Sequence, residues 1–203
     1  MAAIQLTLSN AIRLIAALAP LLLGSFMLLL SVFNQNAKGL VYLAGVILAS
    51  VINIFLMNMM KIKKDPDAAM TCNLVELPFV SNYNSPSGSA LFVAFTFGYL
   101  FMPMKFNNNM NYAVISTLLV ILAMDAVVKV TNKCTTVQGS LVGSLVGVLL
   151  GIVWYSILHS AGADSLLYFD EVESNNVVCS KPSTQTFKCS VYKNGQLVQS
   201  GEA

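Results

Sequence analysis

Residues that could take part in catalysis gather in two polar connections between apolar runs. Pro86–Ser89 stands directly before one apolar run, and Asp65–Pro66 lies earlier in the same connection. Lys129 and Thr135 lie in the connection before a glycine-rich run. Positive charge and backbone amides bind phosphate oxygens, whereas a hydroxyl nucleophile also needs an adjacent base. The single histidine of the chain, His159, lies outside both connections, so Thr135 has no evident base for nucleophilic attack.

The segments that must position these residues are apolar enough to be membrane helices. A spanning helix needs about 20 mainly apolar residues, with a range of about 17–25. The predicted helices cover Ala11–Phe33, Gly39–Met60, Ser89–Phe106, Tyr112–Val128 and Gln138–His159. The predicted fold class is therefore an all-α integral membrane bundle of five transmembrane helices with a small C-terminal β-hairpin tail. A soluble helix bundle is the alternative, but a chain this short lacks enough polar surface to cover five such helices.

Composition supports the membrane class. The chain is 56% hydrophobic and 10% charged, against about 25% charged residues in a typical soluble domain. The net charge is +2 and the basic residues are dispersed, whereas nucleic-acid binding needs a clustered basic face. The first apolar run is longer than the core of a cleaved signal peptide, so it is interpreted as the first membrane helix.

The sequence changes character near Ser160, where the apolar runs stop. We expect residues 1–159 to form the helix bundle and residues 160–203 a polar, strand-rich tail. Val177–Cys179 and Thr186–Tyr192 are predicted strands, and Asn194–Gly195 is typical of a tight hairpin turn. Because about 40 residues cannot bury a sizeable core, we expect the tail to contact the bundle or a protein partner.

A glycine repeat marks the last apolar run. It consists of Gly139, Gly143, Gly147 and Gly151, which share one face of a helix. A glycine face lets a second helix approach closely, and such packing drives helix association inside lipid. The repeat predicts an internal contact of the bundle, with a homodimer face, and hence a homo-oligomer, as the alternative.

Few polar residues interrupt the apolar runs. Asp125 and Lys129 are spaced to pair along one helix face, so the acid is predicted to be satisfied by that lysine and by interfacial water. A proton or ion relay is the alternative for an acid in a membrane segment. Asn53 and Asn58 are predicted to form hydrogen bonds between helices, and together these residues give a channel or carrier little support. The stretch Cys72–Val80 could form a re-entrant or interfacial segment.

The order and spacing of these motifs resemble the type 2 phosphatidic acid phosphatase superfamily, which includes lipid phosphate phosphatases and vanadium haloperoxidases. That family shows K-x6-R-P, then P-S-G-H at a helix start, and then S-R-x5-H-x3-D leading into a glycine-rich helix. The resemblance covers roughly residues 53–154. Pro66, Pro86, Ser87 and Gly88 are retained in this chain.

The remaining motif positions are replaced. In the first motif, the resemblance aligns the lysine with Asn58 and the arginine with Asp65. In the second motif, it aligns the histidine of P-S-G-H with Ser89. In the third motif, it aligns the arginine with Lys129, the nucleophilic histidine with Thr135 and its orienting acid with Gly139. An acid in place of a phosphate-binding arginine repels the substrate, and both histidines are lost. The resemblance therefore implies a catalytically inactive relative that needs no cofactor. A weak or rewired lipid phosphate phosphatase is the alternative, as is headgroup binding by the interfacial lysines Lys61, Lys63, Lys64 and Lys129.

The tail carries a second, looser resemblance. Its segment Phe187–Gly195 is similar to membrane proteins of large DNA viruses of algae and protists. This resemblance implies a non-enzymatic scaffold or anchor in the internal membrane of a virion. Membrane lipid and a capsid protein bound through residues 160–203 would then be its partners.

The four cysteines match no zinc-binding pattern, so no metal site is expected. Cys179 and Cys189 flank a short loop in the tail and could form a disulfide, with free thiols as the alternative.

Membrane orientation follows from the lysines of the connections. The two connections on the N-terminal side contain Lys61, Lys63, Lys64, Lys129 and Lys133, whereas the short connections opposite contain Lys38 and Lys105. The positive-inside rule thus favours a cytoplasmic N-terminus. The family resemblance implies the reverse, because that family's catalytic loops lie on the non-cytoplasmic face.

Overall fold

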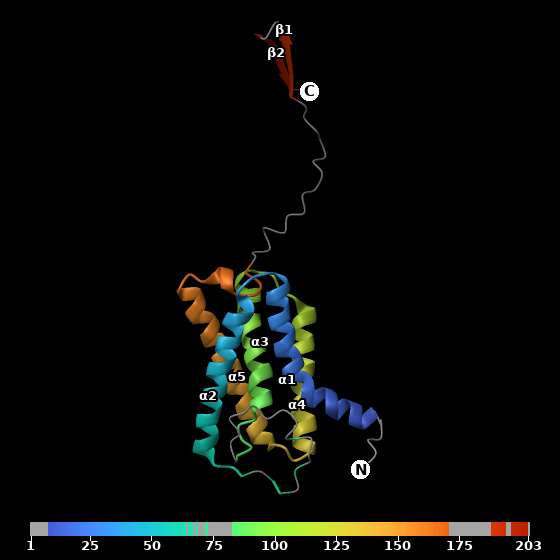
Figure 1. Ribbon diagram of the computed structural model, residues 1–203, viewed down its shortest axis with the longest axis vertical. Helices are drawn as coiled ribbons and strands as arrows, with labels where there is room; N and C mark the ends of the chain where they lie inside the picture. Colours follow the sequence, from blue (N-terminus) through green and yellow to red (C-terminus); the bar gives the residue numbers. More distant parts are fainter. Residues whose placement is uncertain are drawn as a thin grey trace. The chain divides into compact units, whose positions relative to one another are not determined.

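A computed structural model describes residues 8–63, 65–66, 68, 72, 83–170, 188–193 and 196–202. Its helices are α1 (Leu8–Phe33), α2 (Lys38–Met60), α3 (Gly88–Phe106), α4 (Tyr112–Thr131) and α5 (Val137–Ser160), shown in Figure 1. All five are long and apolar enough to cross a membrane. The predicted all-α membrane architecture with five spans is confirmed.

Local capping explains where the later helices begin. The side chains of Ser87, Asn111 and Thr136 each accept a hydrogen bond from a backbone N–H in the first turn of α3, α4 and α5. Such caps satisfy amide groups that the helix itself leaves without a partner. At its other end, α2 stops at Lys61, whose backbone is left-handed with φ 52°. Polar side chains therefore set the starts of α3, α4 and α5.

The third helix forms the centre of the bundle (Figure 1). In α3, 61% of the apolar window is buried, against 11–28% in the other four spans. It is also the least apolar span, and it carries Thr96 and Tyr99 at fully buried positions. The Thr96 hydroxyl lies 2.7 Å from the Tyr42 hydroxyl of α2, so these polar groups satisfy one another. The outer helices instead expose large apolar side chains such as Phe26 and Leu145, as lipid contact requires.

The chain turns back across the bundle after α5. A short 3-10 helix, η2 (Asp164–Leu166), leads into Leu167 and Tyr168, which are both buried. The Tyr168 hydroxyl donates a 2.6 Å hydrogen bond to the Met27 carbonyl of α1, and Lys38 forms an ion pair with Asp170. Burial raises the pKa of Tyr168 above the ordinary tyrosine value, so its hydroxyl stays a donor to a higher pH than that of an exposed tyrosine. The compact helical unit accordingly extends to Val172, beyond the predicted boundary at residue 159.

The second unit covers Glu173–Ala203. Within it, β1 (Lys188–Lys193) pairs antiparallel with β2 (Gln196–Glu202), and the register shifts between Val191 and Tyr192. The predicted strand Val177–Cys179 and the predicted turn Asn194–Gly195 lie outside the described residues, as does most of the predicted segment Cys72–Val80.

Candidate functional site

The connections α2–α3 and α4–α5 meet at one end of the helical unit. The Ser87 amide donates to the Gly139 carbonyl at 3.0 Å, which ties the start of α3 to the start of α5. A disulfide joins Cys72 to Cys134, with their Cα atoms 5.3 Å apart. This bond was not predicted from the sequence, which suggested a bond between Cys179 and Cys189 instead; Cys179 lies outside the described residues. The order of the spans could have revealed it. Cys72 follows the second predicted span and Cys134 follows the fourth, so both cysteines lie on the same side of the membrane.

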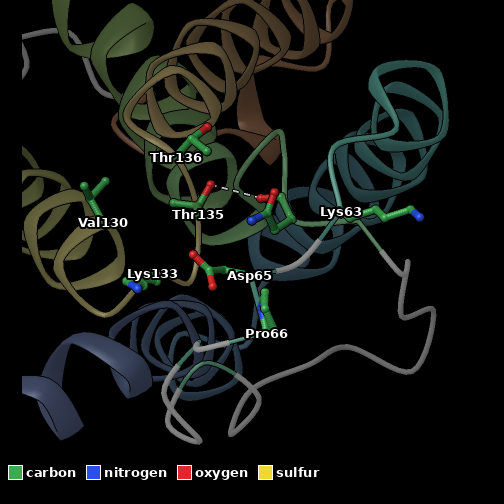
Figure 2. Close-up of a pocket in the computed structure, with 8 residues that line it drawn as sticks. Lys63, Asp65, Pro66, Val130, Lys133, Thr135 and Thr136 are labelled. Carbon is green, nitrogen blue, oxygen red and sulfur yellow. Dashed lines mark hydrogen bonds between the residues drawn. The ribbon is translucent and has the colours of Figure 1, made fainter.

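A pocket of about 410 Å³ opens between these connections (Figure 2). Its lining consists of Lys63, Asp65, Pro66, Asn84, Val130, Lys133, Thr135 and Thr136. In Figure 2 the Asp65 carboxylate faces the side of Lys133 and Thr135, and Lys63 extends away from it. The structure thus brings three motif positions, Asp65, Pro66 and Thr135, into one pocket. The sequence alone does not indicate that Asn84 and Thr136 belong to the pocket, because only the fold brings them to it.

Thr135 occupies the position of the nucleophilic histidine in the motif alignment. Its hydroxyl donates a 2.9 Å hydrogen bond to the Asn84 carbonyl (Figure 2), and the residue is only 5% exposed. An attacking hydroxyl must pass its proton to a base, and a backbone carbonyl cannot accept that proton. The Thr135 hydroxyl therefore fastens the α4–α5 connection to the α2–α3 connection.

The start of α3 presents two serine hydroxyls. Ser87 caps the helix, and the Ser89 hydroxyl donates a 2.8 Å hydrogen bond to a carboxylate oxygen of Asp125 on α4. Asp125 is 1% exposed. Among the described residues no ion pair within 4.0 Å joins Asp125 to Lys129, although the lysine lies near enough for its charge to act on the carboxyl group. The carboxylate instead lies at the N-terminus of α3, where the helix dipole favours negative charge.

The two asparagines of α2 have different surroundings. Asn53 is buried beside the start of α3, where a Cβ atom added to Gly88 would lie 3.5 Å from its amide nitrogen. Asn58 is exposed, so the position aligned with the first lysine of the family does not join the site. The side-chain oxygen of Asn53 and the second carboxylate oxygen of Asp125 are buried and have no hydrogen-bond partner among the described residues.

The glycine face of α5 packs directly on α3 and on the connection before it. Cβ atoms added to the four glycines would come within 2.2–2.6 Å of α3 or of its preceding residues: Gly139 near Ser85, Gly143 near Ser87, Gly147 near Leu91 and Gly151 near Phe95. Three of these contacts are with backbone carbonyl oxygens. This face is therefore an internal contact, and α3 leaves it no room for a second copy of the chain.

Comparison of the chain with protein-family models, with curated proteins and with solved structures finds no match. Within the described residues, no group of three or more histidine, cysteine, aspartate or glutamate side chains is placed to hold a metal ion. Inference about function therefore depends on the geometry of this chain's own residues.

Proposed function

We propose that this protein is a non-enzymatic integral membrane scaffold that retains the helix bundle of the type 2 phosphatidic acid phosphatase superfamily without its catalysis. The observation that carries the proposal is the use of the motif hydroxyls within the fold. Thr135 donates to the Asn84 carbonyl and Ser89 donates to Asp125. The positions aligned with both catalytic histidines thus hold neighbouring segments together.

Charge in the pocket adds support. Asp65 lines the pocket at the position aligned with a phosphate-binding arginine of the family, and a carboxylate there repels a phosphate group. Lys63 and Lys133 line the same pocket and partly offset that charge. These lysines favour the second candidate, a weak or rewired lipid phosphate phosphatase.

The partner side of the proposal concerns residues 160–203. A two-stranded sheet such as β1–β2 is only marginally stable alone in water, so it gains from a partner surface. We infer that the scaffold lies in the internal membrane of a virus particle, surrounded by lipid, and that its C-terminal segment binds a capsid protein.

Phosphatase activity is tested with purified protein and a panel of phosphatidic acids in mixed micelles. We expect phosphate release at the background rate for the wild type, for Thr135→Ala and for Lys129→Ala. Thr131→Ala is the matched control, because Thr131 is exposed and its hydroxyl bonds only to the Val127 carbonyl of its own helix. Wild-type turnover that persists in Thr131→Ala and disappears in Thr135→Ala would favour the phosphatase.

The partner is tested by amine cross-linking in the native membrane, followed by peptide mapping. We expect cross-links from Lys188 and Lys193 to a capsid protein. A Lys188→Arg, Lys193→Arg variant keeps the charge but lacks the reactive amines, so these cross-links should vanish while binding persists. Cross-links from these lysines to other copies of this chain alone would contradict a capsid partner.

A further inference from the structure

The Cys72–Cys134 disulfide carries information about the two sides of the membrane. It joins the α2–α3 connection to the α4–α5 connection, across 62 residues of sequence. Five spans alternate in direction, so these connections lie on the N-terminal side and the segment after α5 lies on the opposite side. In Figure 1 this is the end where α2 and α4 finish and where α3 and α5 begin.

Disulfides form and persist in oxidising compartments and are rare where glutathione and thioredoxin keep thiols reduced. We propose that the end of the bundle with the Cys72–Cys134 disulfide and the pocket faces an oxidising compartment, and that the C-terminal segment lies on the reducing, cytosolic side. Cys179 and Cys189 of that segment are then thiols rather than a disulfide. The N-terminus lies on the oxidising side.

This orientation opposes the one favoured by the lysine count. The N-terminal side has five lysines in its connections, and the opposite side has two in its short connections. The positive-inside rule is a statistical preference for basic residues in cytoplasmic loops. Lys63 and Lys133 line the pocket, so part of the lysine excess reflects the pocket and not the orientation. The disulfide constrains the orientation more strictly, because the cytosol would reduce it.

The orientation determines which partners each side can meet. A shell protein synthesised and assembled in the cytosol reaches only the cytosolic face of a membrane. The C-terminal segment lies on that face, as the proposed capsid contact requires. The pocket opens on the other face, so any ligand that enters it comes from the oxidising compartment or from that leaflet of the bilayer.

Membrane-impermeant, polymer-linked maleimide tests the orientation on the full-length protein in sealed, cytosol-side-out vesicles. Two of the four cysteines are expected to react without reductant, namely those of the C-terminal segment. All four are expected to react after detergent and reductant are added. A Cys179→Ser, Cys189→Ser variant should show no adduct in sealed vesicles and two adducts after permeabilisation and reduction.

Reaction of Cys72 or Cys134 in sealed vesicles without reductant would overturn the proposal. So would tail cysteines that react only after permeabilisation or only after reduction. A glycosylation acceptor sequence appended after Ala203 gives an independent measurement. It should remain unmodified in endoplasmic reticulum membranes, and its glycosylation would overturn the assignment. Neither measurement uses a lipid substrate or a capsid protein, so failure here is distinct from failure of the proposed scaffold function.

Discussion

At the level of single residues, the motif hydroxyls are engaged in contacts that hold the fold together. Ser87 caps α3, Thr135 binds the Asn84 carbonyl, and Ser89 donates to Asp125. The last contact has the largest energetic consequence, because it is the only hydrogen bond described for a carboxylate that is 1% exposed. A buried carboxyl group that loses its hydrogen-bond partner keeps its full desolvation cost.

Replacement of Ser89 by alanine is therefore expected to destabilise the bundle by about 1–3 kcal/mol. The measurement is thermal unfolding of purified protein in detergent. Ser116→Ala is the matched control, since Ser116 is exposed on α4 and bonds only to the Ala113 carbonyl of its own helix. Adding Asp125→Asn to Ser89→Ala should recover part of the loss, because a neutral amide costs less to bury than an ionisable carboxyl group. Equal melting of the two serine variants would contradict a stabilising Ser89–Asp125 contact.

At the level of elements, the α3–α5 contact holds the bundle together. The glycine face of α5 lies against the carbonyl oxygens of α3, and Gly98 of α3 in turn faces the Val148 carbonyl. Helices in lipid gain little from the hydrophobic effect, so close van der Waals packing must supply the attraction. Any side chain on this face forces the two helices apart.

Gly147→Ala should accordingly lower stability by at least about 1–3 kcal/mol, the range for overpacking. The new Cβ atom would lie 2.3 Å from the Leu91 carbonyl oxygen, which belongs to the backbone and cannot rotate away. Gly88→Ala is the matched control, because its Cβ atom would meet Asn53 at an ordinary 3.5 Å. Unfolding in detergent should show a loss for Gly147→Ala alone. An unchanged melting temperature for Gly147→Ala would contradict close contact between Gly147 and the Leu91 carbonyl.

At the level of the whole molecule, the chain divides after the segment that turns back across the bundle and contacts α1 and α2. Leu167 and Tyr168 are buried against the bundle, and Lys38 pairs with Asp170, so the helical unit includes these residues. The division at Val172 therefore leaves every described contact of the first unit intact.

A chain that ends at Val172 is expected to melt at the same temperature as the full-length protein. A chain that ends at Ser160 should be less stable by at least about 1.5 kcal/mol, the lower value for fully burying one large apolar side chain. It also loses the hydrogen bond from Tyr168 to Met27. Thermal unfolding of the three chains makes the comparison. A loss of stability on cutting at Val172 would show that the C-terminal unit supports the bundle.

The sequence predicts the local features of this fold and leaves out most long-range ones. The five spans are predicted from the length of the apolar runs, and the glycine face is predicted from its four-residue spacing. Both patterns involve residues that are close in sequence. The identity of the helix that packs on the glycine face, α3, could not be predicted, because it depends on tertiary packing. The convergence of Asp65 with Thr135, the disulfide between Cys72 and Cys134, and the turn of Asp125 toward Ser89 likewise depend on how distant connections meet. Cysteine pairing in particular cannot be deduced from spacing alone.

The central position of α3 has a consequence for how the protein is made. A span is retained in the bilayer according to its own apolar character, and α3 has the least of the five. Its Thr96 hydroxyl meets Tyr42 only when α2 is in place, and its backbone is closely covered only when the glycine face of α5 packs on it. Because α5 is the last span to leave the ribosome, the third span depends on a neighbour that arrives two segments later. We therefore expect stable insertion of α3 to be completed only after α5 has been synthesised, when the glycine face of α5 packs against α3.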